Sequence, residues 1–344
     1  MDLNPKYDNY DFPIKGPEKQ DGHAGYLTED QIAKLHQFRM MLESEGCTDR
    51  LDTLTLLRFL RARKFDVEAA KAMGADRHYR FLDTEKWRKE VKLDETVPIW
   101  DYPEKAEIGK YYTQFYHKTD KDGRPIYIET LGGIDLTAMY KITSADRMLL
   151  NLAVEYERVA DPRLPACSRK AGHLLETCCT IMDLKGVSIT KVPQVYSYVR
   201  QASVISQNYY PERLGKLYMI NAPWGFSTVW SVVKGWLDPV TVSKINILGS
   251  GYKSELLKQI PAENLPKQFG GECVCEGGCE NSDAGPWHDP EWARPAWWEK
   301  KQDANVIENK GSAIEEPAKA PEAAPAAEGA DATQTAPAPA PAAA

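Results

Sequence analysis

The fold of this chain is decided by residues 209–251, which read YYPERLGKLYMINAPWGFSTVWSVVKGWLDPVTVSKINILGSG. Their pattern predicts a strand over 216–220, a helix over 226–236 and a second strand over 245–248. A strand, a helix and a strand in this order form a parallel βαβ unit. We therefore expect the rest of the chain to extend a mainly parallel sheet.

The helix within this unit has an unusual composition. Its apolar residues follow helical spacing, and Lys234 is its only charged residue. A helix with so little polar surface faces either buried core, which is the commoner case, or a lipid or membrane surface. Gly225 and Gly235 bracket it and Asp238-Pro239 follows it, so both ends suit a hinge. The apolar stripe consists of Phe226, Val229, Trp230, Val233 and Trp236.

The N-terminal part predicts a small all-α module. Thr28 and Gln31 form a capping-box pattern that opens a helix ending at Gly46. A second helix is expected from Thr53, and Asp66 is expected to cap a third.

From about residue 110 the pattern changes to alternating strands and helices, which predicts an α/β domain. Strands are expected over 126–131 and 178–184, and helices over 144–159 and 195–205. The expected divisions are an N-terminal arm (1–25), the helical module (26–95), the α/β domain (96–275), a C-terminal wrap (276–310) and a disordered Ala/Pro-rich tail (311–344). The tryptophans of the wrap, Trp287, Trp292, Trp297 and Trp298, predict that it packs against the body.

The composition excludes several classes of protein. The tail has five acidic residues and one lysine, so the remainder of the chain has a net charge of −3 out of the total of −7. General nucleic-acid binding needs a basic surface, which this balance does not provide. The N-terminus lacks the apolar core of a signal peptide, and no apolar run is long enough to span a membrane. Seven irregularly spaced cysteines fit a reducing cytosol better than a disulfide framework.

No motif of an enzyme or of a nucleotide site is present. The chain has no GxGxxG, Walker, GxSxG or HExxH pattern, so we expect no catalytic activity. Cys273, Cys275 and Cys279, together with His288, could supply four zinc ligands. Their spacing lacks a CxxC pair, so a loop with free thiols is the better explanation and we expect no metal.

Polar residues at two places are candidates for a binding site. The stretch LLRFLRARKFD is rich in arginine, and a solvated helix face with salt bridges is the commoner explanation. The alternative is that Arg63, at the helix end, points at a phosphate.

Glu212 and Lys244 precede the two strands of the βαβ unit. Parallel strands would bring them to comparable levels, as a surface pair or as anchors for a hydroxylated ligand.

Tyrosines gather around the first expected strand. Such side chains are mostly core or edge filler with locally satisfied hydroxyls. A cluster of tyrosine rings can also hold a quaternary ammonium group such as choline. Thr180 and Cys178 share one face of their strand, so a hydroxyl and a thiol project the same way.

Seven stretches of the chain carry one resemblance, and they are LLRFLRARKFD, YHKTDKDGRPIYIE, RLPACSRKAGHLLETCCTIMDLKG, SQNYYPERLGKLYMINAP, STVWSVVKGWLDPVTVSKI, QIPAENLPKQFGG and GPWHDP. Together they resemble the CRAL-TRIO lipid-binding family, and within it the phosphatidylinositol/phosphatidylcholine transfer proteins of the fungal secretory pathway. The resemblance runs from about residue 33 to residue 271, with GPWHDP beyond it.

The resemblance implies a sheet floor with flanking helices and a movable gate helix, here residues 226–237, over a cavity for one phospholipid. The position two residues before Thr180 departs from the family pattern, which has serine where this chain has Cys178, and a thiol is the weaker hydrogen-bond donor. The implied phosphatidylinositol site is Arg63, Glu212, Thr241 and Lys244. The implied phosphatidylcholine site is Tyr112, Tyr116, Tyr127, Tyr156, Cys178 and Thr180.

The resemblance also implies a non-enzymatic, monomeric exchanger without a cofactor, whose ligand is the bound phospholipid. It would be cytoplasmic, would touch Golgi and endosomal membranes transiently, and would present phosphatidylinositol to a phosphatidylinositol 4-kinase. Two alternatives remain open: a module of the same fold for a sterol or isoprenoid, and a lipase or esterase, for which the chain lacks a nucleophile elbow.

Overall fold

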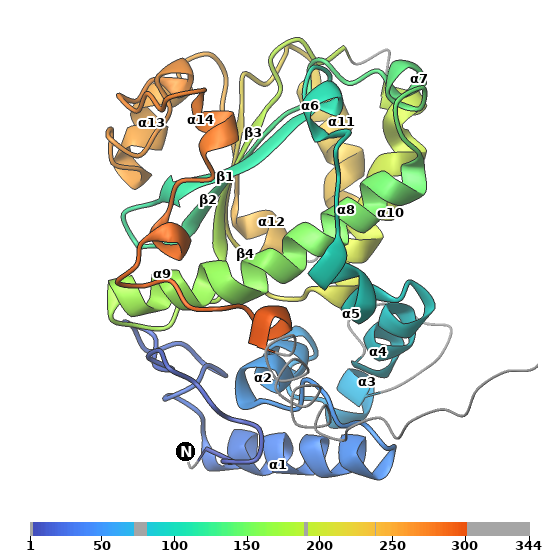
Figure 1. Cartoon of the computed structure of the whole chain (residues 1–344), viewed down its shortest axis with the longest axis vertical. Coiled ribbons are helices and arrows are strands. Elements are labelled where there is room, and N and C mark those ends of the chain that lie inside the picture. Colours follow the sequence, from blue (N-terminus) through green and yellow to red (C-terminus); the bar gives the residue numbers. More distant parts are fainter. Residues whose placement is uncertain (1–2, 72–80, 189–191, 238, 301–344) are drawn as a thin grey trace, which may run out of the picture. The chain divides into compact units, whose positions relative to one another are not determined.

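The computed structural model describes residues 3–71, 81–188, 192–237 and 239–300 (Figure 1). In these residues five strands form one sheet in sequence order, from β1 to β5. The first two strands are antiparallel and the other pairs are parallel, which confirms the mainly parallel α/β fold. The strands are β1 (Thr113–Thr119), β2 (Pro125–Thr130), β3 (Cys178–Asp183), β4 (Leu214–Ile220) and β5 (Ile245–Ile247).

The N-terminal helices form as the sequence predicts. The side chain of Thr28 accepts from the Gln31 backbone and the Gln31 side chain accepts from the Thr28 backbone, so the capping box is present. Helices α1 to α3 pack around Leu35, Phe38 and Leu57, all at most 1% exposed. The helices up to the sheet are α1 (Glu29–Ser44), α2 (Thr53–Ala62), α3 (Val67–Lys71), α4 (Phe81–Glu90), α5 (Leu93–Thr96) and α6 (Lys105–Ile108), with a 3₁₀ turn at Val97–Ile99.

The later helices divide between the two faces of the sheet. Figure 1 shows α8, α10 and α11 on one side, and α13 and α14 on the other. These helices are α7 (Leu136–Met139), α8 (Ala145–Arg158), α9 (Leu164–Ala171), α10 (Val192–Tyr209), α11 (Phe226–Val233), α12 (Pro239–Ser243), α13 (Tyr252–Gln259) and α14 (Cys279–Ser282), with turns at Val159–Arg163, Lys234–Trp236, Lys267–Phe269 and Pro286–His288.

Alternation along the strands gives the two faces different contacts. One set of side chains, including Phe115, Ile128 and Cys179, packs with Tyr252 and Leu256 of α13, and we call this the α13 face. The alternate set packs with α9 and α11, and we call this the α11 face. Its members include Tyr116, Tyr127, Cys178, Leu217 and Met219.

The predicted βαβ unit is present with small changes. The connecting helix ends as a 3₁₀ turn at Lys234–Trp236, and a further short helix, α12, precedes β5. The side chain of Trp236, and Asp238, lie outside the described residues, as does the tail expected over 311–344.

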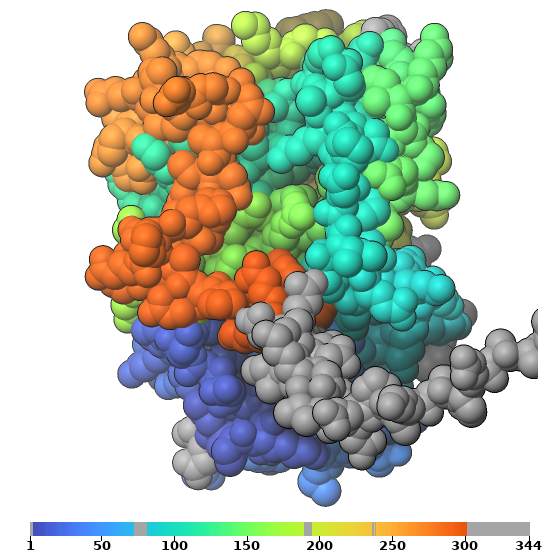
Figure 2. Space-filling model, in the orientation of Figure 1, coloured from blue at the N-terminus to red at the C-terminus, as the bar shows by residue number. Residues whose placement is uncertain are grey.

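The C-terminal segment packs against the body, as its tryptophans predict. In Figure 2 the orange segment runs over the surface beside the green helices and the blue N-terminal region. Trp287 is 5% exposed and packs with Tyr116 and Leu164. Trp297 and Trp298 pack beside Leu93 and Val154, so the segment contacts both α5 and α8.

Candidate binding site on the α11 face

One row of side chains crosses the sheet on the α11 face. The strand register pairs Tyr116 with Tyr127, Tyr127 with Thr180, Thr180 with Leu217, and Leu217 with Ile245. Register partners project to the same face, so the row changes from polar on β1 to β3 to apolar on β4 and β5. The rings of Tyr116 and Tyr127 lie 4.9 Å apart between centroids. The structure thus brings three of the predicted phosphatidylcholine-site residues together.

A buried carboxylate, absent from the residues singled out in the sequence, lies beside this row. Glu129 is 7% exposed and shares a strand face with Tyr127, two residues earlier. Its Oε2 accepts from the hydroxyl of Tyr112 at 2.6 Å and from that of Tyr127 at 3.4 Å. Burial raises the pKa of Glu129 above its ordinary value, although the hydrogen bonds from Tyr112 oppose the shift. The sequence could have indicated Glu129, because it lies two residues after the candidate Tyr127 and so falls on the same face of the strand.

The other two predicted tyrosines, Tyr116 and Tyr156, also have partners within the protein. The guanidinium of Arg163 lies 4.4 Å from the ring centroid of Tyr116, in a cation–π contact. Arg163 is also paired with Glu155 at 3.0 Å. The ring of Tyr156 is stacked on that of Tyr210, with centroids 4.5 Å apart. A bound ammonium group would therefore share the Tyr116 ring with a cation of the protein.

The predicted thiol and hydroxyl are neighbours on β3. Cys178 is 7% exposed and packs with Tyr116, while Thr180 is half-buried. Burial raises the pKa of the Cys178 thiol to about 12, so it is a neutral thiol near pH 7.

The arginine-rich end of α2 contacts the loop before β3. Arg58 and Arg61 both pair with Glu176, at 3.4 and 3.0 Å, so the predicted salt bridges form. Their side chains are only 12% and 7% exposed, so the prediction of a solvated face was wrong for these two. Arg213 donates to the Glu176 backbone oxygen at 3.2 Å. Because Arg61 and Arg213 both contact Glu176, the end of α2 lies near the turn that leads into β4. Arg63 is the half-buried C-cap of this helix.

The other predicted phosphatidylinositol-site residues lie where β4 and β5 begin. Lys244 donates its backbone N–H to the Thr241 oxygen at 3.1 Å and accepts from Leu217 at 3.0 Å. Because Leu217 pairs with Ile245, Lys244 is level with Lys216. Glu212 lies in the turn before β4, with a φ of 61°, so the strand register does not set its level. The expectation that Glu212 and Lys244 come to comparable levels therefore stays a prediction.

The gate candidates cover the apolar end of the row. Phe226 is 7% exposed and packs with Leu217 and Met219, and Val229 and Trp230 pack against the same cluster. Val233 is half-buried.

Large apolar side chains are exposed around this helix. Among the described residues twelve large hydrophobic side chains are exposed, and seven of them lie between residues 196 and 247, on α10, on α11 and in the segments that flank α11. Trp224, directly before α11, is 99% exposed. The others of this group are Tyr196, Val199, Val204, Val232, Val240 and Ile247.

The cysteine run lies against the α13 face, away from the tyrosine row. His288 is not its fourth member: the Nε2 of His288 lies 2.9 Å from Asp283. The fourth group is His117 of β1, whose Nε2 lies 3.3 Å from the Sγ of Cys273. The sequence could not show this pairing, because 156 residues separate the two.

Comparisons with known proteins agree along most of the chain. Residues 109–271 match the CRAL/TRIO domain, and residues 27–73 match the CRAL/TRIO N-terminal domain. The Sec14 cytosolic factor of Schizosaccharomyces pombe is 57% identical over 281 residues, which cover 82% of this chain and 96% of that protein. The SEC14 cytosolic factor of Kluyveromyces lactis is 59% identical over 277 residues, which cover 80% and 90%. The phosphatidylinositol/phosphatidylcholine transfer protein SFH12 of Arabidopsis thaliana is 39% identical over 239 residues, which cover 69% and 43%.

A solved structure supports the fold. The crystal structure of Sfh5 has a TM-score of 0.58 and 15% identity, covering 82% of this chain and 98% of that one. None of the helices in the described residues has the length and apolar character needed to cross a membrane. The identities to the Sec14 cytosolic factors and the two matching domains show that this chain belongs to the CRAL/TRIO family.

Proposed function

We propose that this chain is a phospholipid transfer protein that binds phosphatidylinositol or phosphatidylcholine and exchanges them between membranes. The names of its relatives support this proposal: two are cytosolic factors of the Sec14 type, and SFH12 is named for the transfer of these two lipids. The chain catalyses no reaction in this proposal and needs no cofactor, because the bound phospholipid is itself the cargo.

The observation that supports the proposal most directly is the exposed apolar surface beside α11. Trp224, directly before α11, is 99% exposed, and Val232, on α11 itself, is 56% exposed, while the other side of this helix covers the apolar end of the sheet. Soluble proteins rarely leave such surface uncovered unless it binds a lipid, a membrane or a partner. In our proposal α11 is the gate, and the acyl chains lie beneath it.

The energetics require a protein surface of this kind. Two acyl chains contain ~30 methylenes, and each costs ~0.8 kcal/mol in water, so unaided extraction costs ~20 kcal/mol or more. A transfer protein must replace the bilayer contacts with apolar side chains of its own. The gate residues in our proposal are Phe226, Val229, Trp230, Val233 and Trp236.

The polar groups divide into two headgroup sites. For phosphatidylcholine we propose the tyrosine row, where phenol rings and the Thr180 hydroxyl meet a choline phosphate. For phosphatidylinositol we propose Lys244 and Arg63 as phosphate contacts, with carboxylate and hydroxyl partners for the inositol ring. The full sets are Tyr112, Tyr116, Tyr127, Tyr156, Cys178 and Thr180 for the first, and Arg63, Glu212, Thr241 and Lys244 for the second.

The cellular setting belongs to the same proposal. The protein acts as a cytosolic monomer that touches Golgi and endosomal membranes transiently. It presents phosphatidylinositol to a phosphatidylinositol 4-kinase and so supports phosphoinositide synthesis and secretory traffic.

Lipid extraction from the purified full-length chain tests the proposal. Mass spectrometry of the extract should find phosphatidylinositol and phosphatidylcholine at about one lipid per protein in total. Vesicle assays with labelled lipids should then show transfer of both. Recovery of only a sterol or isoprenoid, or release of a fatty acid from the labelled lipid, would overturn the proposal.

A further inference from the structure

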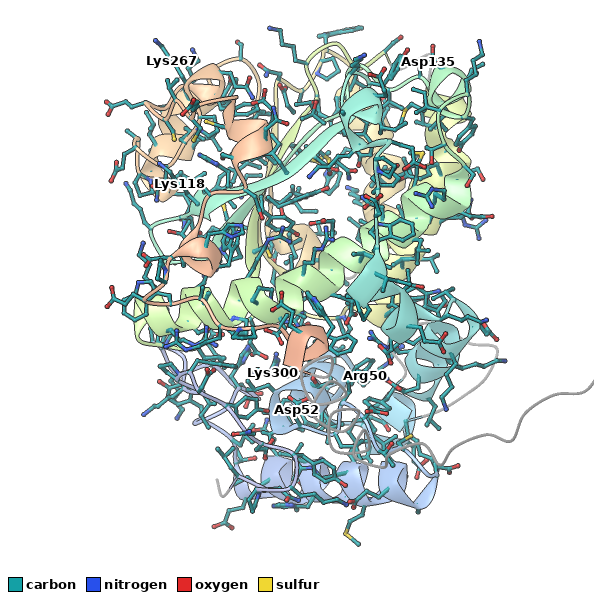
Figure 3. All side chains as sticks on the ribbon, in the orientation of Figure 1. Arg50, Asp52, Lys118, Asp135, Lys267 and Lys300 are labelled. Carbon is teal, nitrogen blue, oxygen red and sulfur yellow. The ribbon has the colours of Figure 1, made fainter. Side chains whose placement is uncertain are left out.

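Four soft metal-binding groups meet against the α13 face, at the edge formed by β1. The Nε2 of His117 and the Sγ atoms of Cys273, Cys275 and Cys279 all lie within 4.8 Å of one another. The Sγ atoms of Cys273 and Cys275 are 3.8 Å apart, and Nε2 of His117 is 3.3 Å from Sγ of Cys273. Lys118 follows His117 in sequence, and Lys267 donates its backbone N–H to the Cys273 oxygen. Figure 3 labels both lysines and shows them on the same side of the molecule.

We propose that these four residues form a structural zinc site of the Cys₃His type. Tetrahedral zinc with sulfur at about 2.3 Å and nitrogen at about 2.0 Å requires edges of about 3.8 Å between sulfurs and about 3.5 Å between sulfur and nitrogen. The distances of 3.8 and 3.3 Å match these edges, and the other pairs, all within 4.8 Å, need to close by about 1 Å at most. Thiolates and imidazole select zinc over magnesium or calcium, which prefer oxygen ligands.

Ser282 is placed to set the tautomer that a metal needs. Its hydroxyl donates to the Cys279 carbonyl oxygen at 2.9 Å and accepts from the Ala284 backbone N–H at 3.4 Å, which leaves one lone pair on its oxygen. The Nδ1 of His117 lies 3.1 Å from that oxygen, and in the proposed site Nδ1 is protonated and donates to it. The lone pair of Nε2 then points toward the sulfurs. An outer hydrogen bond of this kind commonly fixes a metal-binding histidine.

The backbone also presents the four groups toward one point. The register of β1 against β2 shifts between Tyr116 and Thr119, which places a bulge next to His117. Cys273 is held by hydrogen bonds to Leu265 and from Lys267. The turn between Cys275 and Cys279 uses Gly277 and Gly278, both with φ in the left-handed region. Each ligand thus comes from an independently fixed segment.

The site joins the C-terminal segment to the sheet. His117 is 0% exposed and Cys273 and Cys279 are each 7% exposed, so four protein ligands fill the coordination sphere and leave no open position. Its role is therefore structural rather than catalytic. The segment from 272 to 288 has only short helical turns, and the zinc site would add to the anchors that Trp287 and the Arg163–Asp283 ion pair already provide. This inference does not depend on the lipid proposal, because the site lies on the opposite face of the sheet.

Metal analysis of the full-length chain, purified under reducing conditions without chelator, tests the site. Inductively coupled plasma mass spectrometry should find about one zinc per chain. The substitutions Cys275→Ser, Cys279→Ser and His117→Ala should each lower this to below about a tenth. Cys47→Ser, which changes a half-buried cysteine elsewhere, should retain the zinc.

A second measurement keeps the test valid if a variant fails to fold. Wild-type chain stripped with a strong chelator and given Co²⁺ should develop the visible absorption bands of a tetrahedral thiolate site, and added Zn²⁺ should abolish them. Chelation should also lower the melting temperature, and Zn²⁺ should restore it. Zinc below about a tenth of an equivalent in wild type together with no cobalt spectrum would overturn the proposal. A disulfide among these cysteines in freshly reduced protein would also overturn it.

Discussion

The hydroxyl of Tyr112 donates a 2.6 Å hydrogen bond to the carboxylate of Glu129, linking the residue before β1 to the end of β2. Glu129 is 7% exposed and lies on the α11 face. Burial raises its pKa above the ordinary value of 4.5. A raised carboxyl pKa means that the folded state favours the protonated form, so the stability that Glu129 contributes is complete below the unfolded pKa and is lost as the pH rises.

Glu129→Gln should therefore stabilise the protein more at neutral pH than at acid pH. Glutamine keeps an oxygen that can accept from Tyr112 but has no charge to bury. In urea unfolding from about pH 4 to pH 8, the free energy of unfolding of the variant relative to wild type should increase with pH. Glu18→Gln, at an exposed position, should show no such trend. If the difference in free energy of unfolding between the variant and wild type stays constant over this pH range, the pKa of Glu129 is not raised in the folded state.

Cys178→Ser should raise phosphatidylcholine binding without changing phosphatidylinositol binding. The buried thiol, with its pKa raised to about 12, is neutral and a weak donor, whereas a hydroxyl is a stronger one. One additional hydrogen bond contributes about 0.5–1.5 kcal/mol, so phosphatidylcholine affinity should rise about two- to tenfold. Cys179→Ser is the matched control, because this cysteine is buried on the α13 face of the same strand. If both variants change affinity alike, the Cys178 assignment is wrong.

Lys244→Ala should reduce phosphatidylinositol transfer and leave phosphatidylcholine transfer intact. A charge-assisted hydrogen bond to a phosphate contributes about 1.5–3 kcal/mol, so the loss should be about ten- to a hundredfold. The measurement is transfer of each labelled lipid between donor and acceptor vesicles. Lys253→Ala, an exposed lysine of α13, should change neither rate. Equal loss of both lipids in the Lys244 variant would contradict two separate headgroup sites.

The sequence predicted the elements whose signals are local. The capping box at Thr28 and the helical stripe from Phe226 each depend on residues within one turn or two of each other, and the structure has both helices. Strand β1 was missed, because aromatic residues on both of its faces, such as Phe115 and Tyr116, hide the alternation of a half-buried strand.

The site could be predicted only in part, for a related reason. The resemblance supplied the tyrosines, and the register then aligned Tyr116, Tyr127 and Thr180 across three strands. Contacts between distant segments have no local signal. The sequence pattern therefore suggested His288 as the histidine of the cysteine cluster. The packing of β1 against residues 273–279 shows that this histidine is His117.

The hinge proposed at the end of α11 can be tested at Gly235. Its backbone does not occupy the left-handed region, and a Cβ added there would meet no atom within 4 Å. Gly225, by contrast, has a φ of 81° and cannot be replaced without strain. Gly235→Ala should therefore be neutral or should raise the free energy of unfolding by up to about 1 kcal/mol, because alanine restricts the unfolded chain.

The same restriction should slow the movement of the gate. If residues 234–236 flex when a lipid enters, Gly235→Ala should lower the transfer rates of phosphatidylinositol and phosphatidylcholine together, several-fold, at unchanged stability. Gly251→Ala is the matched control, since Gly251 also has open space around it and has an ordinary φ of −83°, but precedes α13. Equal transfer rates in wild type and both variants would mean that the gate moves about another point, because a stiffer hinge must delay both lipids alike.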